Sequence, residues 1–374
     1  MEDNLNLDEN ELSSELTGFN KGEASQRKKL IIIGSVAALV LLVTIIIIFV
    51  ASSGSKNNSG EEEVEEKKEV LGEINCLYDV KSTSKNTVLL SNEFNKNSDF
   101  DIIINGQKIK YTKTYRFDKA GDTSIKFLLY EPLVMDFMFK DVPDIISIRM
   151  SSNKNLEIKS MISAFEDCLG LYEIVIKGFD TSKVTSMKKL FYRTSIDKID
   201  MTDLSTKSVT DMSYMFASTD INRIDVSTMD TSNVETMACM FQHCGSLETL
   251  DLSTFNTENV KDMNSMFFFC PSLNEIKISS FKTSKVTNMN NMFRECISLK
   301  EIDVSNFDTS QVIDMGHMFE NACSLTSLNI KNFNTKNVIN MEYMFAYLTK
   351  IENLDLSSFD TSNVETMSHM FYLC

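Results

Sequence analysis

Apolar and polar residues recur in the same order over the second half of the chain. One copy of this pattern runs from Phe281 to Asn306, and the next begins at Phe307, a step of 26 residues. A period of this length, kept over more than half of the chain, is typical of a stacked solenoid. The copies begin at Phe179, Leu204, Met229, Phe255, Phe281, Phe307, Phe333 and Phe359, and the last of them reaches Cys374.

Each copy contains two apolar groups with different spacings. The first has steps of three or four residues, which predicts one face of a short helix, and the Thr283 and Ser284 hydroxyls before it are suited to capping that helix. In residues 281–306 this group is Val286, Met289, Phe293 and Cys296. The second group includes a step of two and predicts a short strand: Leu299, Ile302 and Val304. We therefore expect an α/β repeat.

A single copy buries too little apolar surface to offset the entropy that is lost in ordering it, so neighbouring copies must stack. Stacking completes the hydrogen bonds of each strand, and we expect a parallel sheet along one face of the solenoid. Its strands are predicted to begin at Leu171, Ile196, Ile221, Leu247, Leu273, Leu299, Leu325 and Ile351.

The first 70 residues contain three segments of different composition. Residues 1–29 are polar, and residues 30–50 are 21 residues without a charge, which is long enough to form a transmembrane helix. Three basic residues directly precede this run and an acidic stretch follows it, so we expect a cytoplasmic tail at 1–29 and the remainder outside the cell. A cleaved signal peptide and a buried core helix are the alternatives for 30–50. Residues 51–70 predict a polar stalk.

Residues 71–150 differ from the repeats and predict a small β-rich domain. The segments Phe100–Ile104 and Gln107–Tyr111 flank Asn105-Gly106, a dipeptide that favours the tight turn of a β-hairpin, and a second apolar run follows at Ser124–Tyr130. We expect this domain to cap the first repeat, because a bare solenoid end leaves apolar surface in water. The solenoid itself is predicted to occupy residues 161–374, with about eight repeats of 25–26 residues.

The repeat also carries a recognisable motif, F-D-T-S-x-V-x-x-M-x-x-M-F-x-x-C-x-S-L-x-x-L-D-L-S, which is in place from Phe179 onward. It resembles the repeat of the BspA-like leucine-rich-repeat surface proteins, a group that includes the mycoplasma lipoprotein-type repeat. The resemblance implies a right-handed leucine-rich-repeat solenoid on a cell surface, where members are linked to adhesion and host-protein binding. The sequence departs from the motif at Lys189-Leu190-Phe191, and the cysteine is replaced by Thr194, Thr219, Ala322 and Leu348.

The charge balance and the absence of catalytic motifs narrow the function. The net charge is −16, and the basic residues form no long cluster, which argues against nucleic acid as a partner. The sequence contains no phosphate-binding loop, no H-E-x-x-H motif and no paired acid and base. None of the three histidines, His243, His317 and His369, has a nucleophile beside it in the sequence. We expect no enzyme activity, no cofactor and no metal.

Two columns of sulfur-containing residues run through the repeats. The methionine column is interpreted as an adaptable core stack and not as a thioether copper site; it comprises Met187, Met212, Met237, Met263, Met289, Met315, Met341 and Met367. The cysteine column could hold buried free thiols, disulfides between neighbouring repeats or a metal; it comprises Cys168, Cys244, Cys270, Cys296 and Cys374, with Cys323 displaced by one position. Cys239 shares a column with Tyr214, Asn291, His317 and His369, residue types that predict an exposed, reactive thiol.

One outward position in each predicted strand is mostly acidic. In chain order this column reads Asp200, Asp225, Asp251, Lys277, Asp303, Asn329 and Asp355. It is either a solvated outer face or a ribbon that binds a basic or polyvalent partner or a cation. Variable positions beside it would extend the ribbon: Arg223, Glu248, Glu275, Lys300, Glu301 and Glu352.

Together these patterns predict a type II single-pass membrane protein in the cell membrane, with its N-terminus in the cytoplasm and its repeats outside the cell. The expected function is adhesion or binding of an extracellular protein or cell-surface ligand, without catalysis. One alternative is a structural coat protein that associates with itself through the open C-terminal repeat. The other is a single-pass receptor that recruits a cytoplasmic partner through residues 1–29.

Overall fold

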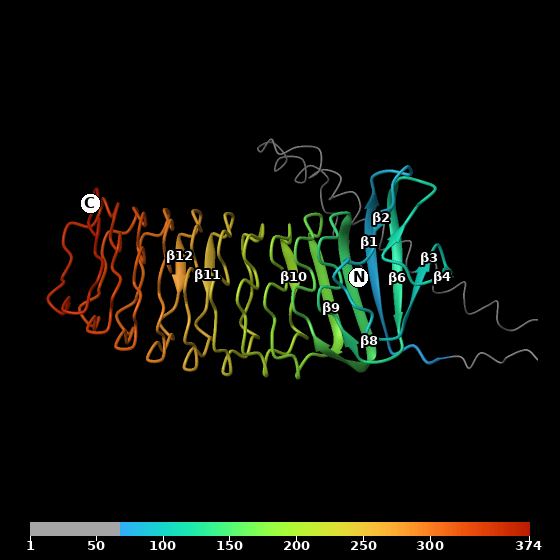
Figure 1. Cartoon of the computed structure of the whole chain (residues 1–374), viewed down its shortest axis with the longest axis horizontal. Helices are drawn as coiled ribbons and strands as arrows, with labels where there is room; N and C mark the ends of the chain where they lie inside the picture. Colours follow the sequence, from blue (N-terminus) through green and yellow to red (C-terminus); the bar gives the residue numbers. More distant parts are fainter. Residues whose placement is uncertain (1–67) are drawn as a thin grey trace, which may run out of the picture. The chain divides into compact units, whose positions relative to one another are not determined.

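The computed structural model describes residues 68–374, which belong to one compact unit. These residues form a β-solenoid that begins with a mixed sheet and continues coil after coil to the C-terminus, as Figure 1 shows. A coil here is one turn of the solenoid, 25 or 26 residues long. The strands are β1 (Gly72–Val80), β2 (Thr87–Val88), β3 (Phe100–Ile104), β4 (Gln107–Ile109), β5 (Thr114–Tyr115), β6 (Gly121–Leu129), β7 (Leu133–Val134), β8 (Ile145–Ser160), β9 (Glu173–Asp180), β10 (Lys198–Asp200), β11 (Thr249–Asp251) and β12 (Glu275–Lys277).

Three of the segments predicted from the sequence are not covered. The tail at 1–29, the apolar run at 30–50 and all but the end of the stalk at 51–70 lie outside the described residues. Between residues 68 and 374, no helix has the length and apolar character needed to cross a membrane.

The strands of the N-terminal part and of the first repeats share one sheet. Its order is β10-β9-β8-β1-β6-β3-β4, with β7 paired to β8. The strands β8, β9 and β10 run parallel, whereas β1 is antiparallel to both β6 and β8. Segment 71–150 therefore continues the solenoid sheet directly. The predicted hairpin is confirmed: β3 pairs with β4, and the turn residues Asn105 and Gly106 have φ angles of 52° and 76°.

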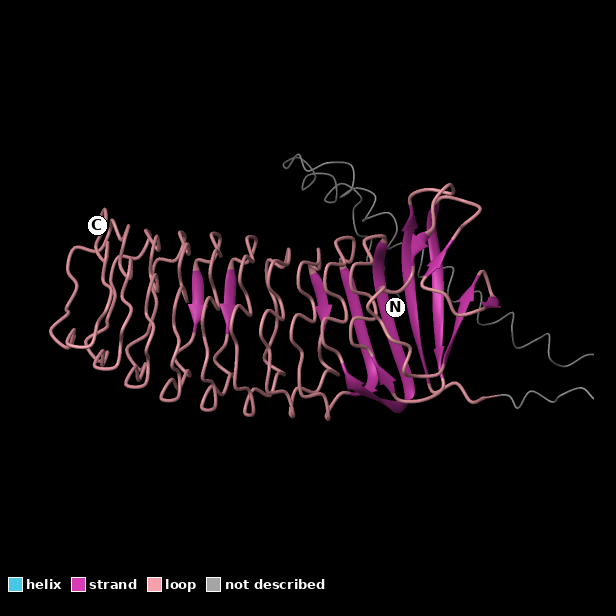
Figure 2. Ribbon diagram, viewed as in Figure 1, coloured by secondary structure: helices cyan, strands magenta, loops and turns pink. Residues whose placement is uncertain are grey.

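The parallel sheet predicted along one face is confirmed in part. The strands β9 and β10 pair in register, as do β11 and β12 (Figure 2). A second parallel ladder of single bridges joins the coils on another side of the solenoid. Its members are Ser186, Asp211, Thr236, Asp262, Asn288, Asp314, Asn340 and Thr366.

The prediction of a short helix in each repeat is wrong. The described residues contain no helix, and the segment with helical spacing forms successive turns. The N–H groups of Met289, Asn291, Phe293 and Glu295 donate to carbonyls of the next coil over 2.8–2.9 Å. Of the N–H groups between them, those of Met292 and Arg294 donate three residues back along the chain, and that of Asn290 donates to the side-chain oxygen of Asn288. In an α-helix every N–H donates to the carbonyl four residues back along the chain. The bonds to the next coil therefore exclude an α-helix here. The repeat is therefore all-β, and the predicted α/β class is corrected.

Alternation between coil-to-coil and local hydrogen bonds needs unusual backbone angles. Asn291 and Glu295 have φ angles of 58° and 61°, and the equivalent pair recurs in the other coils. Side chains other than glycine occupy all of these positions in the repeats, at a cost of about 1–2 kcal/mol each for most residue types. The hydrogen bonds to the next coil must offset that cost, so each coil depends on its neighbour.

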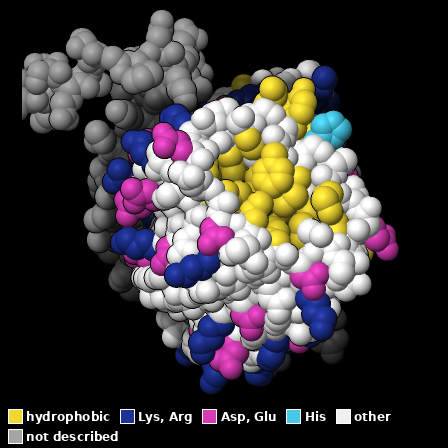
Figure 3. All heavy atoms as spheres, turned by 90° about the vertical axis from the view of Figure 1, so that its left-hand side faces the viewer, with side chains coloured by type: hydrophobic (Ala, Val, Ile, Leu, Met, Phe, Trp, Pro, Cys, Tyr) yellow, Lys and Arg dark blue, Asp and Glu magenta, His cyan; other side chains and the backbone are white. Residues whose placement is uncertain are grey.

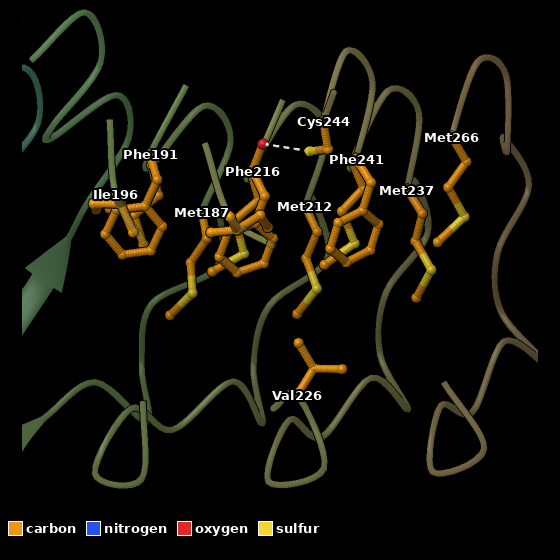
Figure 4. Packing of buried hydrophobic residues seen from close by; sticks show 14 of the residues in the cluster. Met187, Phe191, Ile196, Met212, Phe216, Val226, Met237, Phe241, Cys244 and Met266 are labelled. Carbon is orange, nitrogen blue, oxygen red and sulfur yellow. Dashed lines mark hydrogen bonds between the residues drawn. The ribbon is translucent and has the colours of Figure 1, made fainter. Parts of the chain in front are cut away.

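A stack of phenylalanine rings fills the core of the solenoid (Figure 4). Successive ring centroids lie 5.4–6.1 Å apart, and the ring planes differ by only 4–16°. The buried rings of the stack are Phe139, Phe165, Phe191, Phe216, Phe241, Phe267, Phe293, Phe319 and Phe345, and the exposed ring of Phe371 ends it. A row of methionines, including Met187, Met212 and Met237, lies beside them in the same figure. The methionine column is buried as far as Met341, which agrees with the predicted core stack.

Buried threonine hydroxyls tie each coil to the next. The Thr283 hydroxyl, expected to cap a helix, donates instead to the Asp308 carbonyl of the following coil at 2.9 Å. Thr181, Thr206, Thr231, Thr257, Thr309 and Thr335 make the same bond at 2.9–3.0 Å. These hydroxyls satisfy carbonyl groups that would otherwise lie unpaired in the interior.

An amide brace spans three coils around Asp314. Its carboxylate accepts the side-chain N–H groups of Asn290 at 3.0 Å and Asn340 at 2.9 Å, and it also accepts the backbone N–H of Gly316. A Cβ at Gly316 would lie 2.5 Å from Asn340 Nδ2 and 2.9 Å from Asn290 Nδ2. Glycine at 316 therefore leaves room for both amides to reach the carboxylate.

We predict that Gly316→Ala destabilises the protein by about 1–3 kcal/mol, because the new methyl group displaces at least one of the two amides and leaves its polar atoms unpaired. Gly245→Ala is the matched control, since a Cβ there meets no atom within 4 Å. Thermal unfolding followed by circular dichroism measures both. Equal melting temperatures for the two variants would contradict the proposed brace.

Candidate functional site

The strand face is the surface formed by the outward side chains of β8–β12 and of the equivalent residues in the other coils. Strand pairing places Asp200 beside Val175, and Asp251 beside Lys277. The same row continues across the N-terminal sheet as Arg149, Asn75, Lys126, Ile103 and Lys108. The predicted column is thus one part of a longer row that crosses the whole sheet.

Ion pairs neutralise part of this row. Asp200 pairs with Lys177 at 2.7 Å, and Asp251 pairs with Lys277 at 2.9 Å. In the N-terminal sheet each base of the row has an acid beside it: Arg149 with Glu173, Lys126 with Glu73 and Lys108 with Asp101, each at 2.8 Å. All of these pairs are partly exposed, so each contributes little to stability, but together they cancel charge. The unpaired acids of the row therefore lie among the repeats.

The acidic residues of the column also have a structural task that sequence reasoning missed. Asp225 accepts the backbone N–H of Ser227 at 2.9 Å, and Asp303 accepts that of Ser305 at 3.1 Å. The same bond is made by Asp200, Asp251 and Asp355 with the residue two positions later. An Asp followed two residues later by Ser or Thr is a signal for this turn, and it was present in the sequence. These carboxylates therefore stabilise the turn that follows each strand position.

Hydrogen bonds keep these carboxylates ionised. The Lys177 ammonium and the Thr202 hydroxyl lower the pKa of Asp200 to about 2. Hydrogen bonds from Ser253, followed by the Lys277 ammonium, lower the pKa of Asp251 to about 2. Serine hydrogen bonds also lower the pKa of Asp225, Asp303 and Asp355. The column therefore stays negatively charged well into the acidic range.

Two shallow grooves interrupt the strand face. The larger has a volume of about 650 Å³ and lies between β12 and the next coil. Its lining residues are Asn274, Glu275, Ile276, Lys277, Lys300, Glu301, Ile302, Asp303 and Ser327. The smaller, of about 300 Å³, lies around Asp200 and Asp225. Among the expected residues, Lys277 and Asp303 line the first groove, whereas Asn329 and Asp355 line neither.

Cys239 is not the exposed thiol that was predicted. It is only 6% exposed, and burial raises the pKa of its thiol. Its position has a φ of 57°, a conformation shared by Tyr214, Asn291, His317 and His369 in the same column. Polar residues in that column reflect this backbone conformation as well as exposure to solvent. The column therefore did not show that the Cys239 side chain is exposed.

The cysteine column consists of free thiols that act as hydrogen-bond donors. All eight cysteines are unpaired in the structure. The thiols of Cys244, Cys270 and Cys296 donate to the carbonyls of phenylalanines in the preceding coil, over 3.1–3.2 Å; the first of these bonds is drawn in Figure 4. Thr194 and Thr219 donate their hydroxyls to the equivalent carbonyl of their own coil. A small donor at this position explains why threonine replaces cysteine there.

The described residues include no group of three or more His, Cys, Asp or Glu side chains placed to hold a metal ion. The histidines contribute to stacked side chains instead. Tyr343 lies between His317 and His369, with ring centroids 5.2 and 4.7 Å away and nearly parallel planes. His243 packs against Phe268 and Phe269. His317 also contacts Glu320, with its Nδ1 2.6 Å from the Oε2 atom of that residue, so its ring is held by both packing and a polar contact.

We predict that a maleimide labels Cys374 rapidly at pH 8 in the native protein, because this cysteine is the only one of the eight that is exposed. Burial raises the pKa of Cys244 to about 11 and that of Cys296 to about 12, so both stay protonated and unreactive. Cys374→Ser removes the rapid phase, and denaturant restores labelling of the buried thiols. Rapid labelling of Cys239 in the native protein, identified by peptide mass mapping, would contradict the structure.

Comparison with known protein families identifies the family of the repeats. Overlapping matches to one family cover residues 134–244, 159–275, 247–352 and 296–374. Comparison with curated proteins and with solved structures found no match. The family matches span more than half of the chain and coincide with the solenoid coils. The chain therefore belongs to the repeat family described as "Mycoplasma protein of unknown function, DUF285".

Proposed function

We propose that this chain is a non-catalytic surface protein whose strand face binds another protein. The observation that carries the proposal is the row of exposed side chains presented once per coil by a rigid, hydrogen-bonded backbone. Weak contacts repeated along such a row add up when two surfaces meet, because each contact raises the effective concentration of the next. The permanent charge of the acidic column favours a partner with basic side chains.

We further propose a place in the cell for this function. Residues 30–50 anchor the chain in a membrane as a single span, with residues 1–29 in the cytoplasm and the solenoid outside. The apolar run and the charge asymmetry around it support this orientation. In this proposal the solenoid is a right-handed array of the BspA-like leucine-rich-repeat type and acts in adhesion to an extracellular protein or a cell-surface ligand.

The triple variant Asp225→Asn, Asp251→Asn, Asp303→Asn tests the role of charge on the strand face. Asparagine keeps the side-chain oxygen that accepts the backbone N–H, so the turns remain. We expect the binding of the purified full chain to intact cells to weaken by about tenfold at low salt and to become less dependent on salt. Flow cytometry across a series of salt concentrations measures both effects.

A matched control removes the same charge from another position in the coils. Asp230, Asp308 and Asp360 also accept backbone N–H groups two residues later, in turns that follow the strand face. The triple Asp→Asn variant at these positions should bind as the parent chain does. Equal binding by the strand-face variant, the control and the parent would show that the strand face is only a solvated surface.

A second candidate function, self-assembly, is favoured by the C-terminal end of the solenoid. Figure 3 looks at this end and shows an apolar patch with charged side chains around it. Met367, Phe371, Tyr372 and Leu373 are 44–60% exposed there. An apolar patch of this kind favours association with another apolar surface.

If self-assembly operates, the full chain in mild detergent should form oligomers whose size rises with concentration. The variant Met367→Gln with Leu373→Asn should then be monomeric, because both side chains are exposed and Asn tolerates the φ of 53° at position 373. Light scattering measures the mass. Leu169→Gln, which changes another exposed apolar residue, is the control. A monomeric parent chain would reject this candidate and leave protein binding.

A further inference from the structure

The turn segment of each coil forms a side of the solenoid that is distinct from the strand face. We call this side the turn face: it consists of the outward side chains of residues 289–297 and of the equivalent residues in the other coils. Phe269 and Ile297 lie on it in neighbouring coils and are 43% and 39% exposed. The rings of Phe268 and His243 pack against that of Phe269, with centroids 6.3 and 5.0 Å away. Exposed apolar side chains therefore gather on this side near the middle of the repeats.

The fold does not explain the exposed ring of Phe269. Its φ angle is 58°, in the left-handed region that a bulky side chain adopts only at a cost. Polar side chains occupy the equivalent position in most other coils, and these are Asp167, Arg193, Ser218, His243, Glu295 and Asn321. A polar residue would suit both the backbone angle and the solvent, so phenylalanine at 269 indicates contact with another molecule.

Arg294 braces the aromatic side chains of this region. Its guanidinium lies 5.5 Å from the ring centroid of Phe268, and its Nε is 2.9 Å from a carboxylate oxygen of Glu320. The Nη1 group of the same guanidinium donates to Asn291 Oδ1 at 3.2 Å. Side chains that are fixed before binding lose little conformational entropy when a partner docks.

The position directly after the first methionine of the turn segment carries opposite charges on the two sides of Phe269. Lys188 occupies it three coils before Phe269, and Glu342 occupies it three coils after. Neither side chain makes an ion pair within residues 68–374, and the Glu342 carboxylate accepts the hydroxyl of Ser368 at 2.9 Å. Lys188 is exposed and Glu342 is partly exposed. Both charges are therefore available to a partner.

Charges in this order match when a second copy lies antiparallel with its turn face against the first. A two-fold axis between the faces, crossing both solenoids at Phe269, reverses the order of the coils and keeps each position of the turn segment opposite its equivalent. Lys188 then faces Glu342 of the second copy, and His243 faces Glu295. No two like charges of the turn face oppose each other over the coils from residue 187 to 351. The turn face is therefore complementary to itself in the antiparallel orientation.

We propose that a second copy of this chain docks on the turn face as an antiparallel two-fold dimer. The Phe269 rings of the two copies pack on each other at the centre, and Lys188 and Glu342 form an ion pair at each end that sets the register. This inference goes beyond the proposed function. The strand face belongs to another segment of each coil and stays free, so the dimer presents two strand faces for binding.

The first test removes the central ring from the full chain in mild detergent. Phe269→Asn keeps the backbone, because asparagine tolerates a φ of 58°. Ile313→Asn is the matched control, since Ile313 is 44% exposed but lies beside the ladder of single bridges, outside the turn face. We expect the dissociation constant of the dimer to rise by about thirtyfold for Phe269→Asn and by less than about twofold for the control. Sedimentation velocity over a concentration series measures both constants.

Association through the C-terminal end gives a different pattern. Met367→Gln with Leu373→Asn should leave the turn-face dimer intact, because both residues lie beyond the paired coils. Loss of association in that variant, together with full association of Phe269→Asn, would assign the contact to the C-terminal end. A parent chain that stays monomeric at every concentration, or equal weakening by Phe269→Asn and Ile313→Asn, would also overturn the turn-face dimer. Thermal unfolding followed by circular dichroism verifies that each variant is folded.

Exchanging the two charges tests the antiparallel register. Lys188→Glu and Glu342→Lys, each alone, place like charges opposite each other at both ends of the dimer, and we expect each to weaken it by about tenfold. The chain that carries both substitutions restores opposed charges, so its dissociation constant should return to within about twofold of the parent value. A double variant as weak as the single ones would overturn the register. Cell binding through the strand face is decided by its own triple variant and does not depend on these results.

Discussion

The structure depends on backbone hydrogen bonds that each coil makes to the next one. In residues 281–306 four alternate N–H groups leave their own coil and bond the following coil, while the groups between them close local turns. This division is possible only with positive φ angles at two positions per coil. The stacked phenylalanine rings and the threonine hydroxyls follow the same direction, so the core, the polar contacts and the backbone all link neighbours. No coil satisfies its own polar groups alone.

Much of the architecture could be predicted because it follows from the period of the sequence. The 26-residue step indicates stacking, and the step of two around Ile302 and Val304 indicates extended chain. The hairpin at Asn105-Gly106 follows from local turn chemistry. The sequence alone could not exclude a helix over residues 286–296. Val286, Met289, Phe293 and Cys296 have helical spacing, but spacing does not reveal whether an N–H donates to its own segment or to a neighbouring coil.

The candidate site was predictable only as a row of positions. Alternation along each strand located Asp200, Asp225 and Asp251 on the outside, and the structure places them there. The partners of these residues were not predictable, because the ion pair of Asp251 with Lys277 and the groove beside β12 depend on how coils align in three dimensions. For Cys239 the predicted exposure was wrong. Its column contains polar residues, yet its side chain is only 6% exposed.

The coil-to-coil ladder also determines how the molecule responds to tension. Because each coil bonds only its neighbours, a pulling force on one end of the chain loads a single row of hydrogen bonds at a time. The solenoid therefore yields by peeling, coil by coil, and each step frees 26 residues, or about 90 Å of extended chain. A tethered protein built in this way lengthens under load in small steps and takes up mechanical work, while the coils that remain stacked keep their shape.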